Sequence, residues 1–248
     1  GMGTNGSRST VLGGSALFEA AGKVIEKGKK LAGHLLEAGE QDIEFAEGVF
    51  KVAGTDRSVT LKQVAMAAFN PMRWPKGGGF EGGLYENATY LGQKDTYPNG
   101  CHICEVEIDP ETGVTKIVKF TAVDDFGNII NPMIVEGQVH GGIAQGIGQA
   151  LLEHGVYDHE TGQLLTGSYM DYCMPRADNV PNLKLGFTCT PCPTNPLGMK
   201  GCGEAGAIAS PAAVMNAVTD AIGVRDVPMP ATAQTVWRAM QPMKKAAE

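Results

Sequence analysis

Apolar residues recur at helical spacing near the start of the chain. Between Ser15 and Glu37 they fall three or four positions apart, which places them on one face of a helix. These positions are Leu17, Ala21, Val24, Ile25, Leu31, Leu35 and Leu36. The spacing predicts an amphipathic helix, although Gly22, Gly28 and Gly33 lower its intrinsic helix propensity.

Two pairs of short apolar runs predict β-hairpins. Ile43–Ala46 and Val49–Val52 are separated by a Glu-Gly dipeptide, which is a turn signal. Ile103–Asp109 alternates between apolar and polar residues, and the turn residues Pro110–Gly113 separate it from Val114–Val123. We therefore expect an antiparallel pair of strands in each half of the chain.

Three further helical patterns lie in the second half. Pro132 suits the first position of a helix, so we expect a helix over Met133–Glu153, followed by helices over Ala207–Ile222 and Ala231–Met240. The first of these contains Gly137, Gly141, Gly142, Gly146 and Gly148. Each glycine costs up to about 1 kcal/mol relative to alanine. We therefore expect a neighbouring backbone or a ligand to approach this helix very closely.

The remaining signals complete an α/β fold with mixed sheets and packed helices. Thr60 and Gln63 have the spacing of a capping box, which predicts a short helix over Val64–Phe69. Leu183–Cys189 predicts another strand. Residues 70–100 are rich in glycine and proline and show no periodicity, and such a long loop is usually functional or packed on a partner.

The composition is that of a mildly acidic protein. The 248 residues include 20 basic and 27 acidic side chains, for a net charge of −7. The basic residues are scattered singly, so we expect no nucleic-acid partner, which would need a clustered positive surface. No run reaches the roughly 18 to 20 consecutive apolar residues of a membrane span. Gly1–Gly6 lacks the pattern of a secretory signal, and we expect a cytoplasmic protein.

Two cysteine pairs have the spacing of metal ligands. Cys101 and Cys104 form one pair, and Cys189 and Cys192 form the other. Together they could supply four thiolates to a zinc ion, although known zinc ribbons separate their pairs by about 15 to 20 residues. Buried, unreactive thiols are the simpler interpretation, and a zinc-binding structural module is the alternative.

The segment Gly201–Gly206 contains a glycine fingerprint, GxGxxG. A dinucleotide site requires a strand directly before this motif, and Pro191–Lys200 has three prolines and no strand pattern, so we disfavour that interpretation. Glu204 directly precedes a predicted helix. It could serve as a charge partner for the helix N-terminus, or the flanking glycines could let a substrate or cofactor contact the backbone beside it.

Four segments resemble the molybdenum hydroxylase family, and they occur in the family's order. They are Gly3–Thr10, Ala122–Gly127, Ile130–Gly142 and Asn195–Glu204. The family includes xanthine dehydrogenase, aldehyde oxidase and the molybdenum carbon monoxide dehydrogenase. The resemblance implies that residues 1–248 form the C-terminal molybdopterin-binding domain of the large subunit, as a fragment or separately encoded piece of a larger catalytic subunit.

The resemblance also implies roles for individual residues. The family loop that wraps the pterin and its pyrophosphate is matched by Thr4, Asn5, Gly6, Ser7, Arg8 and Ser9. Gln138 matches a glutamine that contacts the cofactor, and Glu204 matches the glutamate beside the molybdenum that acts as general base. No residue here is expected to ligate a metal. Phe126 departs from the family pattern, because many members have cysteine at this position.

The activity implied by the resemblance is hydroxylation of an aldehyde or an N-heterocycle, with oxygen derived from water. The cofactor would be molybdopterin with molybdenum, in its cytosine dinucleotide form, in the complete enzyme and not in this chain alone. Implied partners are the N-terminal half of the molybdenum subunit, a [2Fe-2S] subunit, an FAD subunit and a small-molecule substrate. The alternative is a non-catalytic remnant or assembly domain, which the presence of Gln138 and Glu204 argues against.

Overall fold

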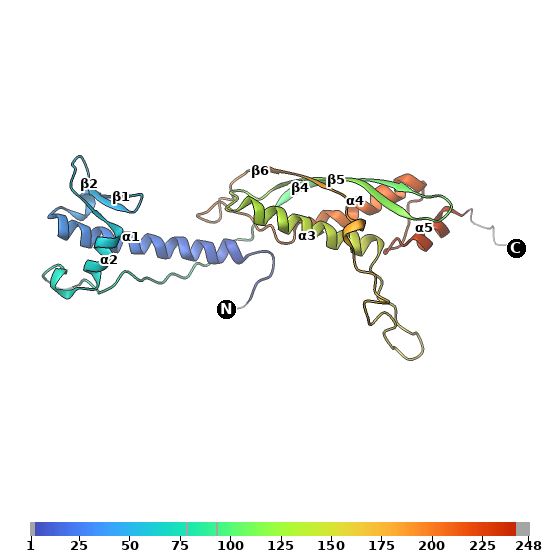
Figure 1. Ribbon diagram of the computed structural model, residues 1–248, viewed down its shortest axis with the longest axis horizontal. Helices are drawn as coiled ribbons and strands as arrows, with labels where there is room; N and C mark the ends of the chain where they lie inside the picture. The colour runs from blue at the N-terminus through green and yellow to red at the C-terminus, as the bar shows by residue number, and fades with distance from the viewer. Residues whose placement is uncertain (1–2, 78, 93, 242–248) are drawn as a thin grey trace. The chain divides into compact units, whose positions relative to one another are not determined.

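The computed structural model describes residues 3–77, 79–92 and 94–241. They fold into two compact units, a larger one with residues 3–11 and 94–241 and a smaller one within residues 12–92 (Figure 1). Each unit packs helices against a three-stranded sheet, which confirms the predicted α/β fold. No helix among the described residues is long and apolar enough to span a membrane.

The smaller unit begins with a long helix. A π-helical turn, Thr10–Gly14, leads into α1 (Ser15–Leu36), as the apolar spacing predicts. The antiparallel sheet has the order β1 (Ile43–Ala46), β2 (Val49–Val52) and β3 (Ser58–Thr60). The first hairpin matches its prediction. The third strand was not predicted, because three residues are too few to show a period of two.

The core of the smaller unit forms around the Phe50 side chain, which is fully buried. Gly28 of α1 lies directly over this ring, since a Cβ atom at Gly28 would fall 2.5 Å from the Phe50 Cζ atom. The packing explains why glycine occupies this helical position. The short helix α2 (Leu61–Ala68) begins with the predicted capping box, in which the amide of Gln63 donates to Thr60 Oγ1 at 3.2 Å.

Residues 70–98 contain a single 3₁₀ turn, Pro71–Arg73, and no other helix or strand in their described part. The predicted loop is therefore confirmed except at its end, where Asn99 and Gly100 already belong to the next strand. It leads into the sheet of the larger unit, which consists of β4 (Asn99–Ile108), β5 (Thr115–Asp125) and β6 (Leu183–Thr188). The strand β5 lies in the centre, antiparallel to β4 and parallel to β6.

The parallel pairing of β5 and β6 positions the functional loops. Asp125 is the last residue of β5, and it lies opposite Thr188, the last residue of β6. The two strands therefore end at the same edge of the sheet. The loops that follow them, although more than sixty residues apart along the chain, leave this edge side by side.

Helices α3 (Pro132–Leu151) and α4 (Ala205–Ile222) pack together along the sheet, and α5 (Ala233–Met240) follows (Figure 1). Glu204 precedes α4 directly, because the helix begins two residues before its predicted start. The fully buried side chains of this core include Phe120, Val139, Ile143, Ile147, Val214, Val218 and Val236.

The glycines of α3 allow the backbone of α4 to approach closely. A Cβ atom at Gly142 would lie 2.8 Å from the Gly206 Cα atom, and one at Gly146 would overlap the Ser210 hydroxyl. The predicted close approach is thus made by a neighbouring backbone. Gly137 and Gly141 behave differently, since a Cβ atom at either would meet nothing within 4 Å. One side of α3 is packed and the other is open.

Candidate cofactor-binding and catalytic site

A pocket of about 410 Å³ opens in the larger unit, where three distant segments of the chain meet. Its lining residues come from the N-terminal loop (residues 4–10), from the stretch between β5 and the first turns of α3 (residues 126–138), and from residues 199–203. All four segments that carry the family resemblance contribute residues to these three stretches. The fold therefore gathers residues that are widely separated in sequence.

The N-terminal loop has a backbone shape that requires unusual torsion angles. Gly3, Gly6 and Ser7 have φ angles of 72°, 58° and 54°, in the left-handed region. The loop also closes on itself, because Arg8 Nη2 donates to the Gly3 carbonyl at 3.3 Å and the hydroxyls of Thr4 and Ser9 are hydrogen-bonded to each other. The result is a compact turn that presents hydroxyl groups to the pocket.

Ser7 connects this loop to Glu204. The Ser7 Oγ atom donates to Glu204 Oε2 at 3.0 Å and accepts a hydrogen bond from the Glu204 amide, also at 3.0 Å. Glu204 occupies the N-cap position of α4, but its side chain makes no cap hydrogen bond to that helix. Its carboxylate is therefore used in a contact with the N-terminal loop.

Glycines on either side of Cys202 make the approach of the loop possible. A Cβ atom at Gly201 would lie 2.7 Å from the Ser7 Cβ atom, which is closer than real side chains come. A Cβ atom at Gly203 would lie 3.2 Å from Ser7 Oγ and 3.5 Å from Gln138 Oε1. Ser7, Gln138 and Glu204, named separately from the sequence, thus surround one short glycine-rich stretch.

The other predicted site residues are distributed unevenly around this point. Thr4, Ser7, Ser9 and Gln138 line the pocket, whereas Asn5, Gly6 and Arg8 are not among its lining residues. Glu204 is exposed and lies next to the pocket, bonded to Ser7. Phe126, the departure from the family pattern, is buried and lines the pocket, and its ring centroid lies 5.8 Å from that of Phe187.

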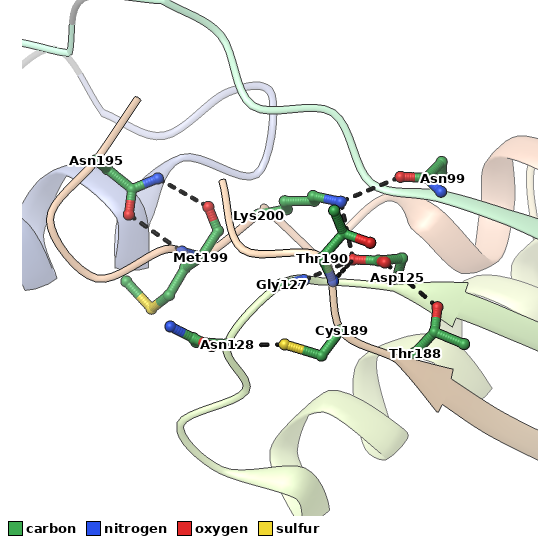
Figure 2. A network of polar contacts seen from close by, with 10 residues as sticks. All are labelled: Asn99, Asp125, Gly127, Asn128, Thr188, Cys189, Thr190, Asn195, Met199 and Lys200. Atoms are coloured by element: carbon green, nitrogen blue, oxygen red, sulfur yellow. Dashed lines mark hydrogen bonds and ion pairs between the residues drawn. The ribbon is translucent and has the colours of Figure 1, made fainter. Parts of the chain in front are cut away.

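A buried ion pair joins Lys200, which lines the pocket, to Asp125 at the end of β5 (Figure 2). Lys200 Nζ lies 2.8 Å from Asp125 Oδ1, and both side chains are at least nine-tenths buried. The same oxygen accepts hydrogen bonds from the backbone amides of Gly127 and Thr190, at 2.9 and 3.1 Å. Burial alone would raise the pKa of Asp125, but the hydrogen bonds from Lys200, Thr190 and Gly127 outweigh it and hold the pKa well below its usual range.

A second polar contact shapes the loop that carries Lys200. The Asn195 side chain accepts from the amide of Met199 at 3.1 Å and donates to the Met199 carbonyl at 2.9 Å (Figure 2). The Asn128 side chain donates to the Leu197 carbonyl at 2.9 Å. The Asn128 bond and the Asp125 pair connect the two loops at the edge of the sheet, and the Asn195 bonds close the second loop on itself. Sequence reasoning missed these contacts, because no periodic pattern marks a polar residue that bonds within or between loops.

The four cysteines of the zinc alternative do not form a metal site. Within residues 3–77, 79–92 and 94–241, no group of three or more His, Cys, Asp and Glu side chains lies together in a way that could hold a metal ion. Burial, with a smaller contribution from the charge of Glu105, raises the pKa of the Cys104 thiol to about 11. Cys189 donates to Asn128 Oδ1 at 3.5 Å. The glycine fingerprint likewise follows a loop and not a strand.

Comparison with known proteins identifies the family. Residues 1–181 match the family model described as a molybdopterin cofactor-binding domain. This chain belongs to the molybdenum hydroxylases. It is 41% identical, over 99% of its length, to the 6-hydroxypseudooxynicotine dehydrogenase complex subunit gamma of Paenarthrobacter nicotinovorans. It is 39% identical, over 97% of its length, to the carbon monoxide dehydrogenase large chain of Hydrogenophaga pseudoflava.

Solved structures agree with this assignment to the molybdenum hydroxylases. The crystal structure of a Cu,Mo-CO dehydrogenase superposes with a TM-score of 0.89 at 38% identity, covering 96% of this chain. Quinoline 2-oxidoreductase from Pseudomonas putida 86 superposes with a TM-score of 0.88 at 41% identity, covering 97%. The chain spans 30% to 31% of the length of these four proteins. The relatives are named as dehydrogenases and oxidoreductases.

Proposed function

We propose that residues 1–248 form the C-terminal molybdopterin-binding domain of the catalytic subunit of a molybdenum hydroxylase. The observation that carries this proposal is that Ser7 and Gln138 line one pocket and that Glu204 lies beside it, hydrogen-bonded to Ser7. A remnant that had lost its activity would be under no constraint to keep a carboxylate, an amide and a hydroxyl together. Their arrangement favours a catalytic role over an assembly role.

The pocket fits a cofactor of the molybdopterin type. A volume of about 410 Å³ lies in the range of small-molecule sites. Gly203 is exposed and lines the pocket together with Cys202, so a ring or a phosphate group can approach the backbone of this stretch without meeting a side chain at Gly203. Hydroxyls from Thr4 and Ser9 and the amide of Gln138 supply polar groups to the same space. We propose the cytosine dinucleotide form, with the N-terminal loop at its pyrophosphate.

In the proposed mechanism, Glu204 is the general base. When bound, the molybdenum of the cofactor supplies the redox chemistry of the hydroxylation, with oxygen derived from water. The Glu204 carboxylate accepts a proton beside the reacting centre, and Gln138 orients the cofactor. General-base assistance is typically worth about 10²- to 10⁴-fold in rate. The proposed substrates are aldehydes or N-heterocycles, as in xanthine dehydrogenase.

The proposed partners are those that the family resemblance implies, and the coverage of about 30% of the relatives' length supports a missing part of the same subunit. We propose that the rest of the molybdenum subunit covers the open side of α3, where Ile130, Met133 and Ile134 are more than half exposed beside the pocket. Exposed apolar patches of this kind mark interaction surfaces. A [2Fe-2S] subunit and an FAD subunit would carry the electrons away, and the complex would be cytoplasmic.

The test uses the reassembled complex, with the missing part of the subunit and the electron-transfer subunits supplied. Glu204→Gln keeps the shape of the side chain and removes the base. We expect turnover to fall at least 10²-fold while the molybdenum content per subunit is unchanged. Substrate panels of N-heterocycles, aldehydes and carbon monoxide identify the reaction. Near-normal activity per molybdenum in Glu204→Gln would contradict the proposed mechanism.

A further inference from the structure

Ser7 holds both the backbone and the side chain of Glu204. Its Oγ atom accepts from the Glu204 amide and donates to Glu204 Oε2, each at 3.0 Å. A serine hydroxyl has one hydrogen to donate, and the contact with Oε2 uses it. In this arrangement Ser7 therefore cannot donate to a cofactor at the same time, although its neighbours Thr4 and Ser9 face the same pocket.

The position of Ser7 is itself constrained from two sides. Its φ angle of 54° is rare for a residue with a side chain, and it follows Gly6, which has a φ of 58°. The backbone of Gly201 also packs against Ser7, since a Cβ atom at Gly201 would lie 2.5 Å from the Ser7 carbonyl oxygen. A residue held in a rarely populated conformation by its surroundings is typical of functional sites.

We propose that Ser7 is a positioning residue for Glu204. The proposal rests on the proposed function, in which Glu204 is the base, and adds the reason why its carboxylate points in one direction. Ser7 holds Oε2, so Oε1 is the atom that accepts the proton. One proton leaves the water-derived group at the reacting centre and binds to Oε1, so the side-chain charge changes from −1 to 0, the charge of the group that loses the proton falls by one, and Ser7 keeps its own hydrogen.

An exposed carboxylate at the end of a flexible side chain would otherwise sample several rotamers. Glu204 is exposed, and no cap hydrogen bond to α4 restrains it. Misplacing a catalytic group by about 1 Å can cost on the order of 10²-fold in rate. The Ser7 contact therefore has a consequence for turnover that differs from that of a cofactor ligand, whose loss lowers occupancy.

The first experiment compares Ser7→Gly with the unchanged protein in the reassembled complex. Glycine removes the hydroxyl and tolerates the positive φ angle. We expect kcat to fall roughly 10- to 100-fold, with KM and molybdenum content unchanged. Ser7→Ala, which keeps the Cβ atom against Gly201, should give the same result. If the molybdenum content falls in proportion to activity, Ser7 is a cofactor ligand and the proposal is wrong.

Ser168→Ala is the matched control. Ser168 Oγ donates to Asp171 Oδ2 at 2.7 Å in an exposed turn of the same unit, so this variant removes the same kind of bond away from the pocket. We expect its turnover to be unchanged.

A double-mutant cycle separates this proposal from the proposed function. If Ser7 acts only through Glu204, then Ser7→Gly causes no further loss in a Glu204→Gln background. If Ser7→Gly lowered kcat by the same factor with and without Glu204→Gln, the positioning role would be overturned while Glu204 could still be the base. Normal activity of Glu204→Gln alone would instead overturn the proposed function.

Amide hydrogen exchange gives a readout that does not depend on turnover. The Glu204 amide donates to Ser7 Oγ, so the peptide containing it should exchange faster in Ser7→Gly than in the unchanged complex. A peptide from α5 serves as the internal reference. Unchanged exchange at Glu204 would mean that the contact is absent in the assembled enzyme, and the proposal would fail.

Discussion

Different interactions stabilise the smaller unit and the loops beside the pocket of the larger unit. In the smaller unit, Phe50 and the helices above it form an apolar core. Beside the pocket, the loops are held by the Asp125–Lys200 pair and by Asn195. When a side chain in an apolar core is shortened, the stability lost is roughly proportional to the buried apolar surface area that is removed. A buried polar network is more sensitive, because the loss of one member leaves its partners unsatisfied.

The two tryptophans allow this difference to be measured in one chain. Trp74 lies in the smaller unit and Trp237 lies in α5 of the larger unit. Trp237→Phe therefore leaves a fluorescence reporter for the smaller unit, and Trp74→Phe leaves one for the larger unit. Each stability prediction below is read in both backgrounds, by urea unfolding of the whole chain.

The largest effect is expected for Asp125→Ala. The change leaves the buried Lys200 ammonium without its carboxylate, and breaking a buried ion pair from one side typically costs about 3–5 kcal/mol. We expect this loss at the Trp237 reporter. Asp158→Ala is the control, since Asp158 accepts similar hydrogen bonds in an exposed turn and should cause a much smaller loss. Equal losses would remove the distinction between the two regions.

The next largest effect is expected for two adjacent glycines of α3, where replacement by alanine should change the stability in opposite directions. Gly142→Ala places a methyl group against the α4 backbone, and overpacking of this kind costs roughly 1–3 kcal/mol. Gly141→Ala meets nothing within 4 Å, so alanine's better helix propensity should stabilise the chain by up to about 1 kcal/mol. Destabilisation by both variants would show that the open side of α3 is already packed.

The acid sensitivity of the larger unit should depend on Asp125. The pKa of Asp125 in the folded chain lies below its unfolded value of about 3.9. Its stabilising contribution is therefore complete above about pH 4 and is lost as the pH falls further. Asp125→Asn removes this dependence, and the slopes of stability against pH should differ by up to one proton, or about 1.4 kcal/mol per pH unit. If stability fell equally steeply with decreasing pH in the unchanged chain and in Asp125→Asn, Asp125 would not be the source of the acid sensitivity.

The smallest effect is expected for Thr60→Ala in the smaller unit. The variant removes the oxygen that accepts the Gln63 amide, and loss of an N-cap typically costs about 1 kcal/mol. Only the Trp74 reporter should shift. A shift at the Trp237 reporter would show that the two units unfold together.

The same contrast explains what could be predicted from the sequence. The helix over Ser15–Leu36 and the capping box at Thr60 are local patterns, and the structure confirms them. The gathering of Ser7, Gln138 and Glu204 could be anticipated only from the family resemblance. The Asp125–Lys200 pair could not be anticipated, since the two residues are 75 positions apart and no sequence pattern marks them as partners.

The contact between Ser7 and Glu204 also sets an order of events during synthesis. Its two residues are 197 positions apart, and closing a loop of that length costs roughly 5 kcal/mol of chain entropy by the (3/2)RT ln n relation. The pocket has no complete wall until the ribosome has released residue 204 and α4 has folded against α3. A cofactor that contacts both the N-terminal loop and residues 199–203 can therefore bind the complete pocket only after the chain has been synthesised beyond residue 204.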